Sequence, residues 1–235
     1  MRRKSTKNVE NRAYRFRLYP NAEQTILINK TIGCSRLIYN SLLTDKKKYY
    51  EETGLSLKKE VSEYKKEKEF LKEVDSLALA NAKLNLETAF KNFFEKRSKY
   101  PKLHKKGKND SYTTNNVNNN IKIVEKKIKL PKLGFVKIKQ HRTFGNDEII
   151  KSATISKVGG NYYISVLTER EPKPVEKVDV STISEDRVLG LDFSVPHFYA
   201  DHNGNYSEYP KYYRTTQKKL AKEQRNLTPI LYLLK

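Results

Sequence analysis

Apolar and polar residues alternate over residues 14–19, and this period of two predicts a half-buried strand. Pro20 ends the strand. Asn21 then suits the N-cap of a helix, because Gln24, three residues later, completes a capping box. We expect Gly33 to provide a point of close packing along this helix. The apolar positions that indicate its buried face are Ile28, Ile32, Leu42 and Leu43.

The following segment predicts further helices. Residues 44–72 are highly charged, and Gly54 separates two helical stretches within them. A stronger amphipathic helix is predicted at about residues 76–95, with Asp75 or Ser76 as its cap. Its apolar positions, spaced three and four apart, are Leu79, Ala82, Leu86, Ala89 and Phe93.

After Pro101 the pattern changes to a basic loop that reaches about Asp110, and then to an asparagine-rich segment at residues 115–120. Gly159-Gly160-Asn161 predicts a tight hairpin. Several short strands, joined by one strand from before the helices, predict a small barrel with an inserted helical domain. The predicted strands cover residues 121–124, 128–130, 135–138, 153–156 and 162–167.

The last segment begins with a linker at residues 171–186. A short apolar run then ends in Asp192, which is typical of a buried strand that presents a carboxylate to a metal ion. A second strand at residues 198–200, a turn at 203–205 and a basic helix at about 214–226 follow. We expect Pro229 to end that helix, with an apolar tail after it.

Charge narrows the choice of partner. Lys and Arg total 48 against 27 acidic residues, so the net charge is +21 and a polyanion is the expected partner. The 16 tyrosines and nine phenylalanines among these charges suit base stacking beside phosphate contacts.

No stretch predicts a membrane span or a signal peptide, which favours nucleic acid over lipid and a cytoplasmic location. The single cysteine, Cys34, excludes an internal disulfide and a Cys-based zinc site in this chain.

Six segments, in order, resemble the N-terminal half of the TnpB (OrfB) family of transposon-associated RNA-guided DNA endonucleases, which are relatives of type V CRISPR effectors. The segments are residues 17–24, 36–40, 85–94, 130–134, 190–192 and 209–214. The resemblance implies an α+β fold: an oligonucleotide-binding-like β-barrel (the wedge domain) interrupted by a helical recognition domain, then the start of an RNase H-like RuvC domain. The implied boundaries are 1–20 for the first wedge strand, 21–108 for the recognition domain, 109–180 for the rest of the barrel, and 181–235 for the RuvC part.

The resemblance also implies partners, namely a guide RNA made from the transposon end and a double-stranded DNA target. Residues that would contact the motif beside the target are Ser76, Leu77, Ala80, Asn81, Asn118 and Asn119. Ser76 and Ala80 are equally explained as a cap and a small packing residue. Residues that would contact nucleic-acid backbone are Lys96, Arg97, Lys99, Lys102, Lys105, Lys106, Lys211, Arg214, Lys218, Lys219 and Lys222.

From the residues alone, Asp192 is more simply a strand-end aspartate, whereas the resemblance identifies it as the first RuvC carboxylate. That chemistry uses two Mg²⁺ ions and needs converging oxygens, which the family takes from segments that would lie beyond Lys235. The spacing of His197 and His202 is more typical of ordinary polar residues than of a metal site. The expected function is therefore guide-RNA and DNA binding by a truncated chain that lacks a complete nuclease centre. The alternatives are a nuclease-dead, RNA-guided transcriptional regulator and a general basic RNA-binding protein.

Overall fold

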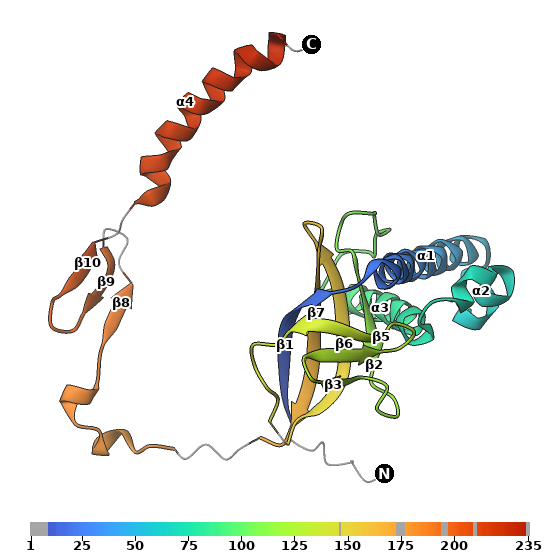
Figure 1. Ribbon diagram of the computed structural model, residues 1–235, viewed down its shortest axis with the longest axis horizontal. Coiled ribbons are helices and arrows are strands. Elements are labelled where there is room, and N and C mark those ends of the chain that lie inside the picture. Colours follow the sequence, from blue (N-terminus) through green and yellow to red (C-terminus); the bar gives the residue numbers. More distant parts are fainter. Residues whose placement is uncertain (1–8, 146, 173–176, 194–196, 209–210, 234–235) are drawn as a thin grey trace. The chain divides into compact units, whose positions relative to one another are not determined.

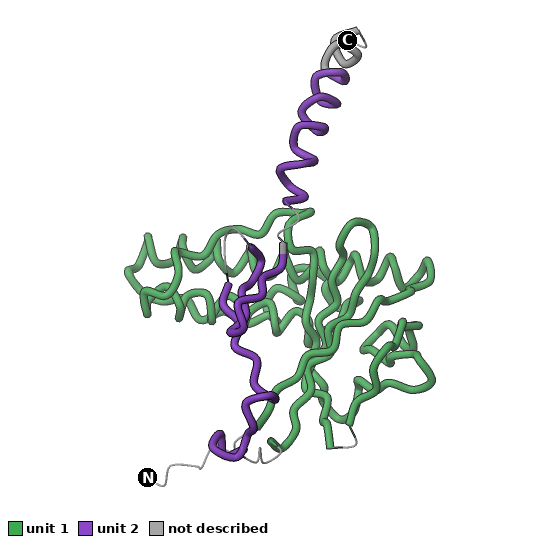
Figure 2. The backbone as a smooth tube through the Cα atoms, turned by 90° about the vertical axis from the view of Figure 1, so that its left-hand side faces the viewer, with its two compact units in different colours: residues 1–173 green, residues 174–235 purple. Residues whose placement is uncertain are grey.

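The chain folds into two units, residues 1–173 (unit 1) and residues 174–235 (unit 2), which Figure 2 shows in different colours. The computed structural model describes residues 9–145, 147–172, 177–193, 197–208 and 211–233. Within these ranges no helix is long and apolar enough to cross a membrane. Unit 1 contains a seven-stranded sheet, and unit 2 contains a three-stranded one.

An antiparallel sheet with the strand order β2-β6-β7-β1-β5-β4-β3 forms the centre of unit 1. Its strands are β1 (Glu10–Tyr19), β2 (Ser111–Asn115), β3 (Lys122–Val124), β4 (Lys127–Leu130), β5 (Gly134–Lys139), β6 (Ile149–Val158) and β7 (Asn161–Arg170). The sheet is strongly curled (Figure 1). β1 lies in the middle of the order, between β7 and β5, so a strand from before the helices does join the later strands as predicted. The closed barrel stays a prediction.

The alternation along β1 places one face of the sheet in a core. Phe16 lies opposite Ile164 of β7, and Leu18 lies opposite Ile138 of β5; all four side chains are buried. Arg15 and Arg17, which alternate with Phe16 and Leu18, are exposed. The period-two pattern in the sequence therefore predicts both the strand and its buried face correctly.

Strand β6 has one partner that the sequence predicts and one that it does not. The hairpin to β7 turns at Gly159 and Gly160, whose φ angles of 54° and 78° suit a two-residue turn that needs positive φ at both positions. On its other side β6 pairs with β2 over five residues. In β2 only Tyr112 and Thr114 are buried, so the segment has no apolar alternation and resembles a polar loop in the sequence.

Three helices and a short 3₁₀ turn separate β1 from β2. They are α1 (Ala22–Thr53), α2 (Val61–Glu67), η1 (Glu69–Lys72) and α3 (Ser76–Phe94). The predicted capping box is present at the start of α1: the Gln24 backbone N–H donates to Asn21 Oδ1 at 2.8 Å, and the Asn21 N–H donates to Gln24 Oε1 at 3.1 Å. Gly54 ends α1 with a φ of 70°, as the sequence predicts.

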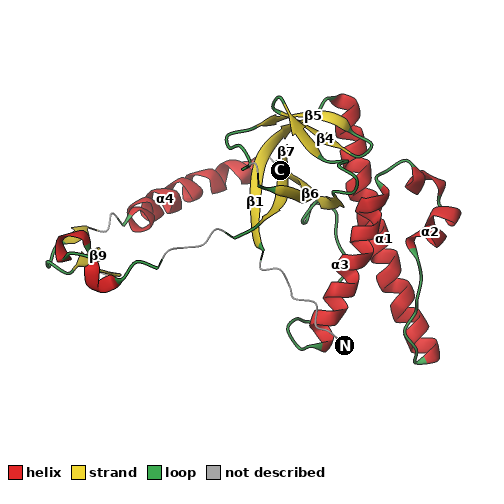
Figure 3. Ribbon diagram, turned by 90° about the horizontal axis from the view of Figure 1, so that it is seen from below, coloured by secondary structure: helices red, strands yellow, loops and turns green. Residues whose placement is uncertain are grey.

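Helix α1 joins two hydrophobic cores. Its first turns contribute Ile28 and Ile32 to the core inside the sheet, whereas its later turns contribute Leu42 to a second core made with α2, η1 and α3. Leu27 packs against both cores. Figures 1 and 3 show the three helices gathered on one side of the curled sheet. The predicted domain boundaries at residues 20, 108 and 180 stay predictions.

One expectation about α1 is wrong. A Cβ atom added to Gly33 would meet no other atom within 4 Å, so nothing packs closely at this position. Gly33 lies on a half-buried side of the helix, while its buried neighbours Ile32 and Cys34 make the contacts.

The described part of unit 2 contains two 3₁₀ turns, a small antiparallel sheet of order β10-β9-β8 and a helix. The elements are η2 (Val180–Thr182), η3 (Glu185–Arg187), β8 (Leu191–Phe193), β9 (His197–Asp201), β10 (Tyr206–Glu208) and α4 (Tyr212–Leu233). The expectation that the strand of Asp192 is buried is wrong, because Leu191 is 58% exposed and Phe193 is 72% exposed. Among the described residues of unit 2, no second layer covers this sheet.

The expected end of α4 at Pro229 is also wrong, because the helix continues to Leu233. A proline inside a helix removes one backbone hydrogen bond and crowds the preceding turn. The residues after it include isoleucine and leucines, which are compatible with helix, so the helical geometry is retained beyond the proline.

Candidate nucleic-acid interface

The start of α3 is capped by Asp75 and presents two small side chains to solvent. Asp75 Oδ1 accepts a hydrogen bond from the Leu77 backbone N–H at 2.9 Å. Ser76 and Ala80 are exposed one turn apart on the helix, and Leu77 is half-buried. Ser76 Oγ accepts a hydrogen bond from Lys65 Nζ at 2.8 Å. Ser76 is therefore the first helical residue after the cap, and its hydroxyl lies on an accessible surface.

Asn81 connects this helix to the sheet. Its amide nitrogen donates to the Leu77 carbonyl at 3.0 Å and to the Thr113 carbonyl of β2 at 3.1 Å. Both amide hydrogens are thereby used, which leaves the Oδ1 atom to accept a hydrogen bond from a ligand. Asn81 therefore has a structural role. The base-edge contact predicted from the sequence is limited to acceptance of a hydrogen bond by its Oδ1 atom.

Asn118 and Asn119 form the exposed tip of a turn. Both have left-handed φ angles, 52° and 55°, which asparagine tolerates better than most residues. The turn is held by its neighbours: Asn120 Oδ1 accepts from the Val117 N–H at 3.0 Å, and Asn116 Nδ2 donates to the Ile150 carbonyl at 2.9 Å. The asparagine run therefore divides into residues that hold the turn and residues that are free to contact a ligand.

The two parts of the predicted motif site lie beside the same strand. Asn81 binds β2 at Thr113, and Asn118 follows Thr113 by five residues, a chain span of at most about 18 Å. This separation allows one DNA duplex to contact both parts. The contact itself remains a prediction.

The basic loop after α3 is fixed to α1. Asn40 Oδ1 accepts from the His104 backbone N–H at 2.8 Å, and Asn40 Nδ2 donates to the His104 carbonyl at 3.0 Å. The His104 ring stacks on Tyr39 with centroids 3.8 Å apart. Arg36 Nη1 forms an ion pair with Asp110 Oδ1 at 2.9 Å, which holds the end of the loop. Burial, followed by the charge of Arg36, lowers the pKa of His104 and favours its neutral form near pH 7.

Because the loop is anchored, its cations are presented from a defined backbone. The predicted backbone contacts of this loop, all exposed, are Lys96, Arg97, Lys99, Lys102, Lys105 and Lys106. Arg97 pairs with Glu95, whereas the five lysines form no ion pair with any residue that the structure describes. The sequence predicted these charges but not the anchors Arg36, Tyr39 and Asn40. Their occurrence together in one of the family-like segments is the signal that could have indicated them.

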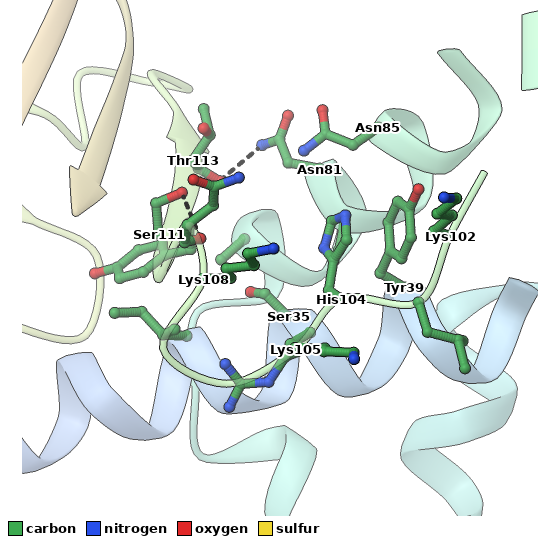
Figure 4. Close-up of a pocket in the computed structure, with 17 residues that line it drawn as sticks. Ser35, Tyr39, Asn81, Asn85, Lys102, His104, Lys105, Lys108, Ser111 and Thr113 are labelled. Atoms are coloured by element: carbon green, nitrogen blue, oxygen red, sulfur yellow. Dashed lines mark hydrogen bonds between the residues drawn. The ribbon is translucent and has the colours of Figure 1, made fainter. Parts of the chain in front are cut away.

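A pocket of about 480 Å³ lies where α1, α3, the basic loop and β2 meet (Figure 4). Helix α1 contributes Ser35 and Tyr39, and α3 contributes Asn81 and Asn85, while the loop contributes His104. A volume of this size is in the range of small-molecule and cofactor sites. The sequence did not predict this pocket.

In unit 2 the basic helix carries a continuous stripe. Lys211, just before α4, and Arg214, Lys218 and Lys222 are spaced three or four apart, with Lys219 beside them, and all are exposed. Tyr212 and Tyr213 are also exposed. Positions three and four apart share one face of a helix, so the stripe suits contact with a phosphate backbone.

Asp192 lies in the middle of β8, exposed, and opposite Ala200 of β9. His202 Nδ1 accepts a hydrogen bond from the Gly190 N–H at 3.1 Å, and the Asp201 carboxylate accepts from the N–H groups of Asn203 and Asn205. Among the described residues there is no group of three His, Cys, Asp or Glu side chains that could hold a metal ion. A Mg²⁺ pair needs converging oxygens, so these residues do not fit it.

Comparison with known proteins places these features in a family context. A family model described as a helix-turn-helix domain (HTH_OrfB_IS605) matches residues 10–54, which form β1 and α1. A protein of Escherichia coli K12 named as the RNA-guided DNA endonuclease InsQ is 28% identical over 225 residues, covering 92% of this chain and 53% of that protein. An RNA-guided DNA endonuclease by name from Streptomyces pristinaespiralis is 30% identical over 229 residues, covering 92% of this chain and 54% of that protein.

The chain thus spans about half the length of these two relatives. A solved structure, the cryo-EM complex of Cas12f1 with sgRNA and target DNA, aligns with a TM-score of 0.36 and 13% identity. That alignment covers 95% of this chain and 64% of the Cas12f1 chain.

Proposed function

The chain belongs to the TnpB (OrfB) family, and on this premise we propose that it binds a guide RNA and a double-stranded DNA target. The names of the two relatives support guided DNA recognition as the function of the family. The observation that carries the proposal for this chain is the anchored basic loop. Its exposed lysines lack acidic partners in the described part of the chain, and its backbone is held by Asn40 and Arg36.

The proposed architecture follows the family. We assign the curled sheet to the oligonucleotide-binding-like wedge domain and the segment from α1 to α3 to the recognition domain. Unit 2 is assigned to the start of the RuvC domain, with its three strands and one helix. The guide RNA is proposed to come from the transposon end, and these partners suit a protein of the cytoplasm.

Within this architecture, the start of α3 and the turn at Asn118 and Asn119 are proposed to contact the motif beside the DNA target. Exposure of Ser76, Ala80 and both asparagines supports this assignment. Lysines and arginine of the basic loop and of α4 would neutralise phosphates, which positions nucleic acid without reading its sequence.

Asp192 is proposed as the first RuvC carboxylate. The metal that the family chemistry implies, Mg²⁺, does not fit the described residues alone, because Asp192 has no second and third ligand beside it. We therefore propose nucleic-acid binding, without a cleavage step, as the activity of the described residues.

The test is to purify the chain from cells that express the transposon, sequence the RNA that co-purifies, and measure binding and Mg²⁺-dependent cutting of a matching DNA. We expect one transposon-end RNA, guided binding, and no effect of Asp192→Ala on that binding. Heterogeneous RNA would favour a general RNA-binding protein instead. Robust cutting that Asp192→Ala abolishes would overturn the binding-only proposal.

Charge variants locate the binding surface in the same assay. The double substitution Lys105→Ala/Lys106→Ala should reduce the magnitude of the slope of log affinity against log salt concentration by about 2. Each lost phosphate contact lowers the magnitude of this slope by about 0.9. Lys47→Ala/Lys48→Ala is the matched control, since it removes the same charge from exposed lysines that pair with Glu51 and Glu52 on α1. Equal effects of the two variants would contradict a specific role for the loop.

A further inference from the structure

The pocket between α1, α3, the basic loop and β2 has the walls of a base-binding site. The stacked rings of Tyr39 and His104 line one part of it, and Tyr112 lines another. Figure 4 shows His104 next to Tyr39, with Asn81 and Asn85 above them on α3. A flat aromatic wall favours stacking of a planar heteroaromatic ring, and it does so for any of the four bases.

Polar groups without a hydrogen-bond partner among the described residues line the same pocket. Ser35 is 7% exposed, and its Oγ atom has no hydrogen-bond partner, which is unusual for a buried hydroxyl. The amide nitrogen of Asn81 donates to two carbonyls, whereas its Oδ1 atom accepts no hydrogen bond from the described residues. The Asn85 side chain makes no hydrogen bond with the residues that the structure describes. These are donors and acceptors of the kind that match the edge of a base.

The charge at the pocket selects for an anionic ligand. Lys102, Lys105 and Lys108 line it, together with Arg36, and no carboxylate is among its lining residues. Arg36 is neutralised by Asp110, but the three lysines form no ion pair with any described residue. Exposed lysines beside aromatic and amide walls suit a phosphate next to a base.

We propose that this pocket takes one unpaired nucleotide of the bound nucleic acid, with its base against His104 and its phosphate at the lysines. The inference rests on the proposed function, since it names how that interface holds its ligand. In a paired duplex the base faces are stacked and the Watson–Crick edges are occupied, so paired DNA can offer the pocket only its phosphates. An unpaired nucleotide satisfies the aromatic wall, the polar groups and the lysines together.

The experiment uses the full chain and synthetic probes: a fully paired DNA duplex, the same duplex with a single unpaired thymidine, and the matching pair of RNA duplexes. We expect the probe with the unpaired nucleotide to bind on the order of tenfold more tightly than its paired counterpart, which is the effect of one base–aromatic stack. His104→Ala should abolish this preference, so that it weakens binding of the probe with the unpaired nucleotide more than binding of the paired probe. Preference in the DNA pair assigns the nucleotide to the target, and preference in the RNA pair assigns it to the guide.

Ser35→Ala separates binding from folding. Because the Ser35 hydroxyl has no partner, its removal should leave the stability of the free chain unchanged or raised, while it weakens binding of the probe with the unpaired nucleotide severalfold. Ser62→Ala, on the exposed side of α2, is the control and should change neither property. Equally tight binding of the paired probe and of the probe with the unpaired nucleotide would overturn the proposal for the pocket and leave the proposed function intact. Failure to bind any probe would overturn both.

Discussion

At the scale of single residues, a polar network joins Asp45, Lys59 and Tyr64 beside the helical core of unit 1. Asp45 of α1 accepts hydrogen bonds from the Tyr64 hydroxyl of α2 and from Lys59 Nζ, the latter at 2.9 Å. The Lys59 ammonium also lies 4.2 Å from the centroid of the Tyr64 ring. Burial raises the pKa of Asp45, but the hydrogen bonds from Tyr64 and Lys59 outweigh it and lower that pKa overall. The network links α1 to the segment before α3.

This network predicts acid sensitivity. A carboxyl group with a lowered folded-state pKa stabilises the fold above its unfolded pKa of about 3.9, and this contribution is lost as pH falls through the lower folded value. We expect Asp45→Asn to reduce the free energy of unfolding at pH 6 and to remove part of its decrease toward pH 2. Urea unfolding of both chains between pH 6 and 2 measures this. Parallel curves for the two chains would contradict the role of Asp45.

At the scale of elements, the sequence predicts what local pattern and capping determine. The alternation in β1, the capping box of α1 and the glycines of the β6–β7 turn are all local, and each is confirmed. β2 was missed because its polar sequence becomes a strand through pairing with β6, some 40 residues later. Long-range pairing of this kind leaves little trace in the periodicity of the segment itself.

The candidate site likewise has a part that is predictable from the sequence and a part that is not. The lysines of the basic loop are evident from composition, whereas the pocket needs α1 to meet a loop 64 residues later in the chain, through the bonds between Asn40 and His104. The exposure of β8 was not predicted either, because burial of its apolar residues depends on a covering layer and not on their own sequence.

The anchoring of the basic loop can be tested through Asn40. Asn40→Ala removes both hydrogen bonds to His104, each of which contributes roughly 1 kcal/mol, and should free residues 102–108 from α1. We expect faster tryptic cleavage at the lysines of the loop, with little change in the unfolding of the rest of unit 1. Asn40→Asp keeps the acceptor for the His104 N–H and should give an intermediate rate. Cleavage rates equal to those of the parent chain would show that the loop is held by other contacts.

At the scale of the whole molecule, stability is concentrated in unit 1. Every buried residue among those described lies between Phe16 and Thr168, and both hydrophobic cores, which α1 connects, lie within this range. Unit 2 has no buried residue in its described part, and its apolar side chains Leu191, Phe193 and Phe198 are exposed. Burial of apolar surface is the main favourable contribution to folding. Unit 2 is therefore expected to add little to the stability of the chain.

A chain shortened to residues 1–172 tests this distribution. We expect it to fold and to unfold in urea with the same midpoint as the full chain, within about 0.5 kcal/mol of free energy, because both cores are retained. Circular dichroism of the two chains measures the midpoints. A markedly lower midpoint for the short chain would mean that residues after 172 stabilise unit 1.

The central position of β1 has a consequence for how the chain is made. Ribosomes release residues 10–19 first, yet the partners of this strand, β5 and β7, end at Lys139 and Arg170. At about 5–20 residues per second, the interval before β7 is complete is roughly 8–30 s. During that time α1, α2 and α3 can already dock on one another, while Leu18 has no partner strand until β5 is made and Phe16 has none until β7 is made. The helices of the nascent chain are thus in place before the sheet closes around its first strand.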